Sequence, residues 1–152
     1  MNIGLDFVKV RIELPDDNML NSSAETLWAE SLGNDLYKLK NSPFWAYGFS
    51  FEDVVIAKGE DIPTVETVHS HSGHSTYRVL LEKGVFDSDR FQSAWSKLEL
   101  LGCTYEGSQS SLLSIDVPAE SDIFKVYELL EMGEVTNVWE FEEAKCAHKT
   151  EV

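Results

Sequence analysis

One stretch of the sequence, His74 to Cys103, restricts the folds that the chain can adopt more than any other. Near its start Tyr77, Val79 and Leu81 recur at every second position, a spacing typical of a strand. Apolar residues then recur at helical spacing, at Phe91, Ala94, Trp95, Leu98 and Leu101. Asp87 or Ser88 can cap the start of this helix, and Gly102 can end it in the left-handed conformation. The stretch therefore predicts a strand, a turn and a helix.

The same two spacings continue to the end of the chain. They predict strand 75–81, helix 87–101, strand 103–106, strand 112–117 after a turn at G-S-Q-S, helix 121–132 ended by Gly133, and strand 138–144. The order β-α-β-β-α-β in so short a span predicts a ferredoxin-like sandwich, in which two helices cover one face of a four-stranded antiparallel sheet. The expected strand order is 4-1-3-2, with strand 75–81 in a central position.

Residues 1–72 show strand spacing and no helical pattern. The predicted strands are 7–14, ended by P-D-D-N, then 25–32, 36–39, 54–58 and 64–71, with Gly33, Asn34 and Asp35 forming a hairpin turn. Five short strands predict a small antiparallel β-barrel-like module. Pro43 and Gly48 break the aromatic-rich segment 41–50, whose rings we expect to fill a small core. The chain is thus predicted to be α+β, with a module at 1–72 packed on a module at 73–152 as one compact unit.

Charge limits the kinds of partner. The 152 residues include 12 basic and 27 acidic side chains, for a net charge of −15, and both modules are acidic. Binding to nucleic acid or to an anionic membrane surface is disfavoured, because both would have to overcome this repulsion. The acidity can serve solubility alone, or it can serve a cationic partner. No segment resembles a signal peptide or a membrane span, so a cytoplasmic location is expected.

Several short motifs resemble those of a known family. They are W-A-E at Trp28, N-S-P-F-W-A-Y-G at Asn41, E-D-V-V at Glu52, S-G-H-S-T-Y-R at Ser72, L-G-C-T-Y-E-G at Leu101 and V-W-E-F-E-E-A at Val138. Together they resemble a small bacterial domain-of-unknown-function family, the one numbered 4265, over nearly the whole chain. The resemblance implies a bacterial cytoplasmic protein and brings no catalytic residues. It matches His74 to the family histidine and leaves His69 and His71 without a counterpart.

No constellation of residues points to a reaction. His69, His71 and His74 could supply three metal ligands, but no cysteine accompanies them, so a hydrogen-bonded strand edge is the preferred interpretation and no metal is expected. Cys103 and Cys146 lack a C-x-x-C spacing and should lie on opposite edge strands, about 14 Å apart, as free thiols. His148 lies near Cys146 on a tail that we expect to be frayed. Nucleophile-elbow, P-loop and dinucleotide motifs are absent, so neither catalysis nor a cofactor is predicted.

The second module carries the better functional indication. On the sheet face away from the helices we expect Thr76, Arg78 and Leu80 to be displayed beside Ser114, Asp116, Glu140 and Glu142. An RNA-binding sheet of this topology needs exposed aromatic and basic residues, which this face lacks. We therefore expect either the first module or a basic partner to cover it. The predicted partner-binding residues are Glu128, Glu131, Glu134, Asp116, Glu140 and Glu142.

These observations predict a non-enzymatic acidic binding protein that neutralises a basic protein partner. The most concrete form is an immunity protein or antitoxin against a nuclease toxin, because a nuclease presents a basic cleft to phosphate and an acidic inhibitor would associate with it rapidly. The alternative is a small-molecule sensor or enzyme with a site at the junction of barrel and sheet. Its predicted ligand-binding residues are His74, Ser75, Tyr77, Arg78, Trp45 and Tyr47.

Overall fold

The structure is a computed structural model that describes residues 7–15, 23–107 and 111–150. It divides into two compact units, Met1–Ser72 and Gly73–Val152. The described residues form nine strands and two helices, so the predicted α+β fold is confirmed. Most of the predicted turns at P-D-D-N and G-S-Q-S fall outside the described residues.

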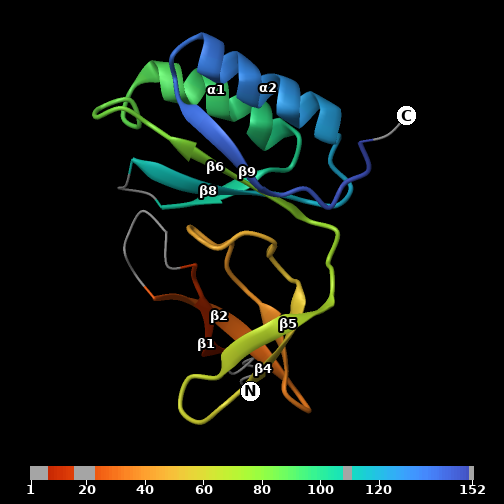
Figure 1. The fold of residues 1–152 in the computed structure, drawn as a ribbon. Helices are drawn as coiled ribbons and strands as arrows, with labels where there is room; N and C mark the ends of the chain where they lie inside the picture. The colour runs from red at the N-terminus through yellow and green to blue at the C-terminus, as the bar shows by residue number, and fades with distance from the viewer. Residues whose placement is uncertain (1–6, 16–22, 108–110, 151–152) are drawn as a thin grey trace, which may run out of the picture. The chain divides into compact units, whose positions relative to one another are not determined.

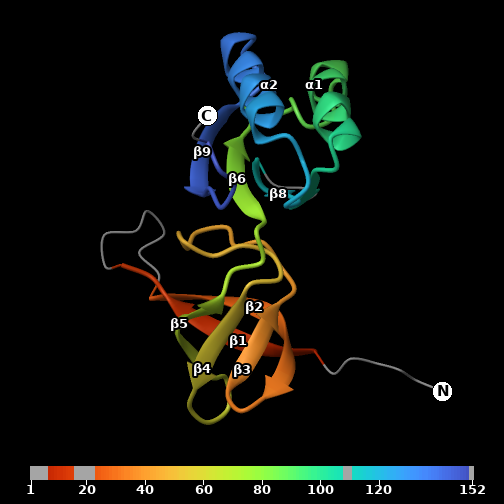
Figure 2. The ribbon, with the colours of Figure 1, turned by 90° about the vertical axis from the view of Figure 1, so that its right-hand side faces the viewer.

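The first unit is a single sheet that closes on itself. Its strands are β1 (Phe7–Glu13), β2 (Ala24–Gly33), β3 (Leu36–Leu39), β4 (Val54–Lys58) and β5 (Thr64–Ser70). Neighbouring strands pair antiparallel in the order β1-β2-β3-β4-β5, and β5 returns to pair in parallel with β1 at Thr64 and Arg11 (Figure 2). Gly33, Asn34 and Asp35 all have positive φ angles, of 82°, 56° and 64°, which confirms the predicted hairpin turn.

A carboxylate holds the irregular segment between β3 and β4. Glu25 of β2 accepts hydrogen bonds from the backbone N–H groups of Phe44, Trp45 and Ala46 at 2.6, 3.0 and 3.0 Å. These bonds satisfy backbone donors that have no strand partner, which is why a segment without regular structure is stable here. Trp45 and Phe49 pack against the core of this unit as predicted, whereas the prediction is wrong for Tyr47, which is exposed.

The second unit is a two-layer sandwich. Its elements are β6 (Ser75–Leu80), α1 (Asp89–Leu100), β7 (Thr104–Glu106), β8 (Leu112–Val117), α2 (Ile123–Val135) and β9 (Glu140–Lys145). The antiparallel sheet has the order β7-β8-β6-β9, and both helices lie on one of its faces (Figure 1). The predicted strand order is confirmed, and β6 is central. The core between the layers includes Tyr77, Val79, Phe91, Trp95, Leu113, Ile115, Leu130 and Trp139.

The predicted ends of α1 are confirmed, whereas the predicted end of α2 is wrong. Ser88 caps α1 by accepting from the Phe91 N–H, and Gly102 adopts a φ of 97° after the last turn. Gly133 does not end α2, which continues to Val135. A Cβ at Gly133 would lie 2.3 Å from Cε2 of Trp139, so this glycine permits the indole ring to pack directly against the helix.

The two cysteines lie where the strand order predicts. Cys103 precedes β7 and Cys146 follows β9, and these strands are the opposite edges of the sheet. Both are free thiols.

Candidate functional site

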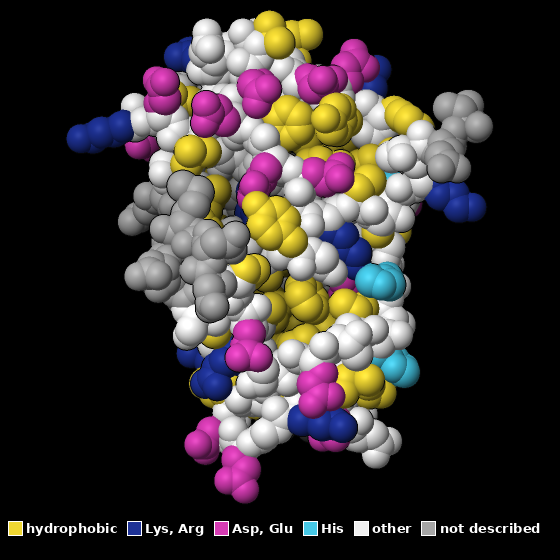
Figure 3. All heavy atoms as spheres, in the orientation of Figure 1, with side chains coloured by type: hydrophobic (Ala, Val, Ile, Leu, Met, Phe, Trp, Pro, Cys, Tyr) yellow, Lys and Arg dark blue, Asp and Glu magenta, His cyan; other side chains and the backbone are white. Residues whose placement is uncertain are grey.

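The candidate site lies on α2 and β9, which pack against each other in the second unit. These two elements carry two lysines, Lys125 and Lys145, and six glutamates. We call the six glutamates the acidic surface: Glu128, Glu131, Glu134, Glu140, Glu142 and Glu143. All six side chains are exposed. Figure 3 shows carboxylates gathered over this part of the unit, with apolar side chains between them.

Three glutamates of the acidic surface bind groups of their own unit. Glu134 accepts from the backbone N–H of Phe141 at 3.3 Å, on the free edge of β9. Glu142 accepts from Nε of Arg78 at 2.9 Å. Glu143 accepts from the hydroxyl of Tyr77 at 2.8 Å.

The other three, Glu128, Glu131 and Glu140, are available to a partner. Among the residues that the structure describes, no donor forms a hydrogen bond or ion pair with any of their carboxylates. Of the predicted partner-binding residues, these three are therefore the ones that a cationic partner could neutralise without breaking an internal bond.

A hollow of about 290 Å³ lies beside the acidic surface. Its lining consists of Tyr77, Ile123, Phe124, Tyr127, Glu128, Glu131, Glu143 and Thr150. Burial raises the pKa of the Tyr77 phenol well above its usual range, and the hydrogen bond to Glu143 raises it further. The phenol therefore stays protonated and keeps donating to Glu143.

Four of the residues expected on this sheet face are not open to solvent. Thr76, Arg78, Ser114 and Asp116 are buried, with exposed fractions of 8% or less. Oδ1 of Asp116 lies 2.8 Å from Nδ1 of His74, and Asp116 does not belong to the acidic surface. The alternation of the strands predicts which face a side chain takes, but not whether that face meets solvent. Leu80, Glu140 and Glu142 are exposed as predicted.

The alternative ligand-binding residues of the second unit use their polar atoms internally. His74 binds Asp116, Tyr77 binds Glu143, and Arg78 binds Glu142. Ser75, the fourth of these residues, forms a hydrogen bond with His148. Trp45 and Tyr47 belong to the first unit, where the Tyr47 side chain is 57% exposed.

The pair of Ser75 and His148 fastens the C-terminal segment. Ser75 Oγ lies 2.6 Å from Nδ1 of His148, whose Nε2 lies 2.8 Å from the carbonyl oxygen of Pro118. The backbone N–H of Ala147 also donates to Ser75 Oγ, at 2.9 Å. His148 is half-buried, so the expectation of a frayed tail is wrong. Ser75 is fully buried, and a hydroxyl without access to substrate cannot act as a nucleophile.

The described residues offer little else for chemistry. No group of three or more His, Cys, Asp or Glu side chains among them is arranged to hold a metal ion. Burial raises the pKa of the Cys103 thiol to about 12, and nearby Asp116 adds to the shift. Cys103 is therefore protonated at neutral pH and a poor nucleophile.

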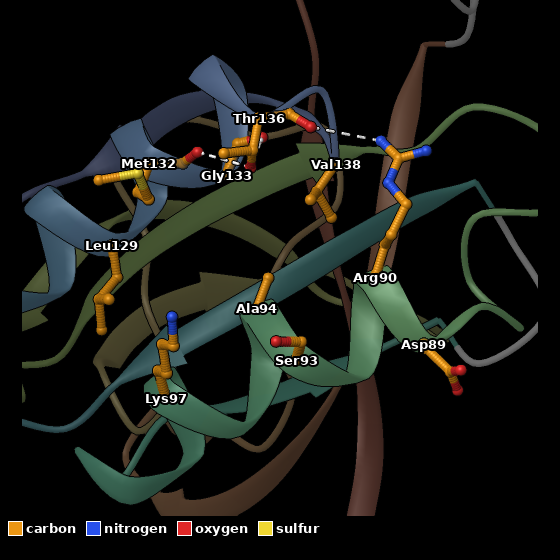
Figure 4. A pocket seen from close by; sticks show the side chains of 10 residues that line it. All are labelled: Asp89, Arg90, Ser93, Ala94, Lys97, Leu129, Met132, Gly133, Thr136 and Val138. Atoms are coloured by element: carbon orange, nitrogen blue, oxygen red, sulfur yellow. Dashed lines mark hydrogen bonds between the residues drawn. The ribbon is translucent and has the colours of Figure 1, made fainter.

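A second hollow, of about 470 Å³, lies between α1 and α2 (Figure 4). Arg90 reaches across it from α1 and donates to the carbonyl oxygens of Thr136 and Asn137 at the end of α2. Ala94 and Gly133 are small and leave the space open. The lining holds Asp89, Arg90 and Lys97, a mixture of charges that complements neither a cationic nor an anionic partner.

The family described as Domain of unknown function (DUF4265) matches residues 25–141. The chain belongs to this family. This match confirms the family resemblance that the sequence motifs predicted. No curated protein matches the chain.

The fold of this DUF4265 protein also occurs in a solved structure. It is similar to a crystal structure described as that of a hypothetical protein from Neisseria gonorrhoeae, with a TM-score of 0.76 and 17% sequence identity. The similarity covers 93% of this chain and 96% of the other. In the described part of the chain, neither helix has the length and apolar character needed to cross a bilayer.

Sequence reasoning missed three residues of the candidate site: Phe124, Tyr127 and Glu143. Phe124 and Tyr127 are one turn apart on α2, and this spacing resembles a core stripe although both side chains are exposed. Glu143 continues the alternation of Trp139 and Phe141, which points it toward the helix layer. A charged residue at a helix-facing position is unusual, and this feature of the sequence could have indicated that Glu143 belongs to the site.

Proposed function

We propose that this DUF4265 protein is a non-enzymatic binding protein whose acidic surface neutralises a basic protein partner. The observation that carries the proposal is the set of Glu128, Glu131 and Glu140, which are exposed on two adjoining elements and bind no group of the described chain. Glu128 and Glu131 lie one turn apart on α2, where like charges repel, and a cationic partner relieves that repulsion.

In its most concrete form, the partner is a nuclease toxin of the bacterial cytoplasm and this protein is its immunity protein. A nuclease needs a basic cleft for phosphate, and a carboxylate surface can occupy that cleft in place of the nucleic acid. The net charge of −15 supports the proposal, because it accelerates association with a basic partner. The alternative small-molecule site has less support, since His74, Ser75, Tyr77 and Arg78 bind protein groups.

We also propose a fold type for each of the two units. The order β-α-β-β-α-β and the sheet β7-β8-β6-β9 support a ferredoxin-like second unit. The pairing of β5 with β1 supports a barrel-like first unit.

The test uses the protein encoded by the gene next to that of this chain as the partner. The variant Glu128→Gln, Glu131→Gln, Glu140→Gln removes the available carboxylates. A matched variant, Glu13→Gln, Glu60→Gln, Glu99→Gln, changes net charge equally at exposed positions elsewhere. Association rate and affinity are measured against ionic strength for both variants and the parent.

The site variant should bind at least about fivefold more weakly for each close charge pair lost, and its association should depend less on salt. The matched variant should lose only a small part of the association rate. Equal losses in the two variants would exclude the acidic surface as the binding site. The absence of any complex with a basic protein from the neighbouring gene would refute the proposed function.

A further inference from the structure

The hollow beside the acidic surface combines aromatic rings with carboxylates at its rim. We infer that it receives the guanidinium group of an arginine from the partner. This inference rests on the proposed function and specifies how the acidic surface is anchored. The volume of about 290 Å³ is at the lower limit for small-molecule pockets, so it suits one side chain better than a cofactor.

The aromatic wall is held in a fixed orientation. Tyr127 meets Tyr77 and Phe141 edge to face, with ring centroids 6.3 and 5.5 Å apart and interplanar angles of 72° and 81°. Phe124 lies one turn earlier on α2 and is 55% exposed. A guanidinium group is planar and weakly hydrated, so it stacks on such rings at little desolvation cost, whereas an ammonium group holds its water more strongly.

The carboxylates at the rim are placed to pair with a forked donor. Glu128 and Glu131 are separated by one helical turn, and Glu143 approaches from β9. Oε1 of Glu143 accepts from Tyr77, which fixes that side chain, while no donor among the described residues reaches its Oε2. Five N–H donors in a rigid fork can serve several carboxylates at once, which a lysine serves less well.

Charge and apolar character together select this occupant. A partner with an apolar side chain would fill the hollow but would remove water from three carboxylates without compensating them. An acidic side chain would be repelled. An arginine can stack on the rings and donate hydrogen bonds to the carboxylates.

The test compares fluorescein-labelled hexa-arginine with hexa-lysine, two peptides of equal charge, by fluorescence anisotropy at low ionic strength. The variants are Phe124→Ala and Glu131→Gln, and the control is Glu99→Gln on α1. Amide shifts at Tyr127, Glu128 and Glu143 in a titration with the arginine peptide locate the site. Unfolding midpoints establish that each variant is folded.

The parent should prefer the arginine peptide, and Phe124→Ala should weaken arginine binding by about two- to fivefold and remove most of the preference. Glu131→Gln should weaken the binding of both peptides, and Glu99→Gln should affect neither strongly. Equal affinity for the two peptides with no effect of Phe124→Ala would refute the arginine site and leave a purely charge-driven surface intact. Failure of both peptides to bind would also refute it. The partner experiment with the triple variant then judges the proposed function separately.

Discussion

Replacing Gly133 by alanine sets two effects of opposite sign against each other. Alanine in a helix is favoured over glycine by about 1 kcal/mol. The new Cβ, however, would lie 2.3, 2.4 and 2.5 Å from Cε2, Nε1 and Cζ2 of Trp139. Carbon atoms in contact lie about 3.5–4.0 Å apart, so the ring or the helix would have to move by more than 1 Å.

Trp139 has little freedom to make that movement. Its side chain is 4% exposed, it donates from Nε1 to the carbonyl oxygen of Leu130 at 3.0 Å, and its ring packs edge to face on Phe91. Overpacking a core costs about 1–3 kcal/mol, and weakening this hydrogen bond adds about 0.5–1.5 kcal/mol. After the gain in helix propensity, we expect Gly133→Ala to lower the free energy of unfolding by about 0.5–3.5 kcal/mol.

Urea unfolding followed by far-UV circular dichroism measures this loss as a lower midpoint at unchanged slope. The same substitution in a Trp139→Leu background supplies the control, because leucine lacks the indole atoms that clash. There the alanine should cost little or should stabilise the helix. A parent protein made more stable by Gly133→Ala, or an equal cost in both backgrounds, would refute the explanation.

Three further outcomes follow from the second unit. Trp95 is 5% exposed in the core, so Trp95→Ala should cost about 3–5 kcal/mol in urea unfolding. Glu142→Gln should cost more than Glu128→Gln in the same assay, because Glu142 pairs with the buried Arg78. Burial raises the pKa of the Cys103 thiol from 9 to about 12. Between pH 9 and 12 the thiol is therefore ionised in the unfolded chain and still protonated in the folded protein. The unfolding free energy should therefore fall as pH rises from 9 toward 12, less so in Cys103→Ala.

The order of elements could be predicted because it depends on local spacing. The change from period two at Tyr77, Val79 and Leu81 to helical spacing at Phe91 identifies β6 and α1. In a chain of this length, β-α-β-β-α-β leaves few ways to pair four strands, so the order β7-β8-β6-β9 followed.

Long-range packing could not be predicted in the same way. A glycine near the end of an apolar helix looks like a stop signal, but Gly133 is required by Trp139, a residue in the next element. The buried Asp116 likewise forms a hydrogen bond with His74, far away in sequence, and His148 of the C-terminal segment forms one with Ser75. Each of these contacts is specific to side-chain geometry, which spacing does not encode.

The glutamates of α2 and β9 divide by physical role, and this division separates function from solubility. Glu134 accepts a hydrogen bond from the backbone N–H of Phe141 on the outer edge of β9. A charged edge strand resists pairing with other chains. Glu142 and Glu143 neutralise Arg78 and orient Tyr77. Solubility and edge protection explain carboxylates anywhere on this surface. They give no reason for Glu128 and Glu131 to line an aromatic hollow, and a cationic partner does give one.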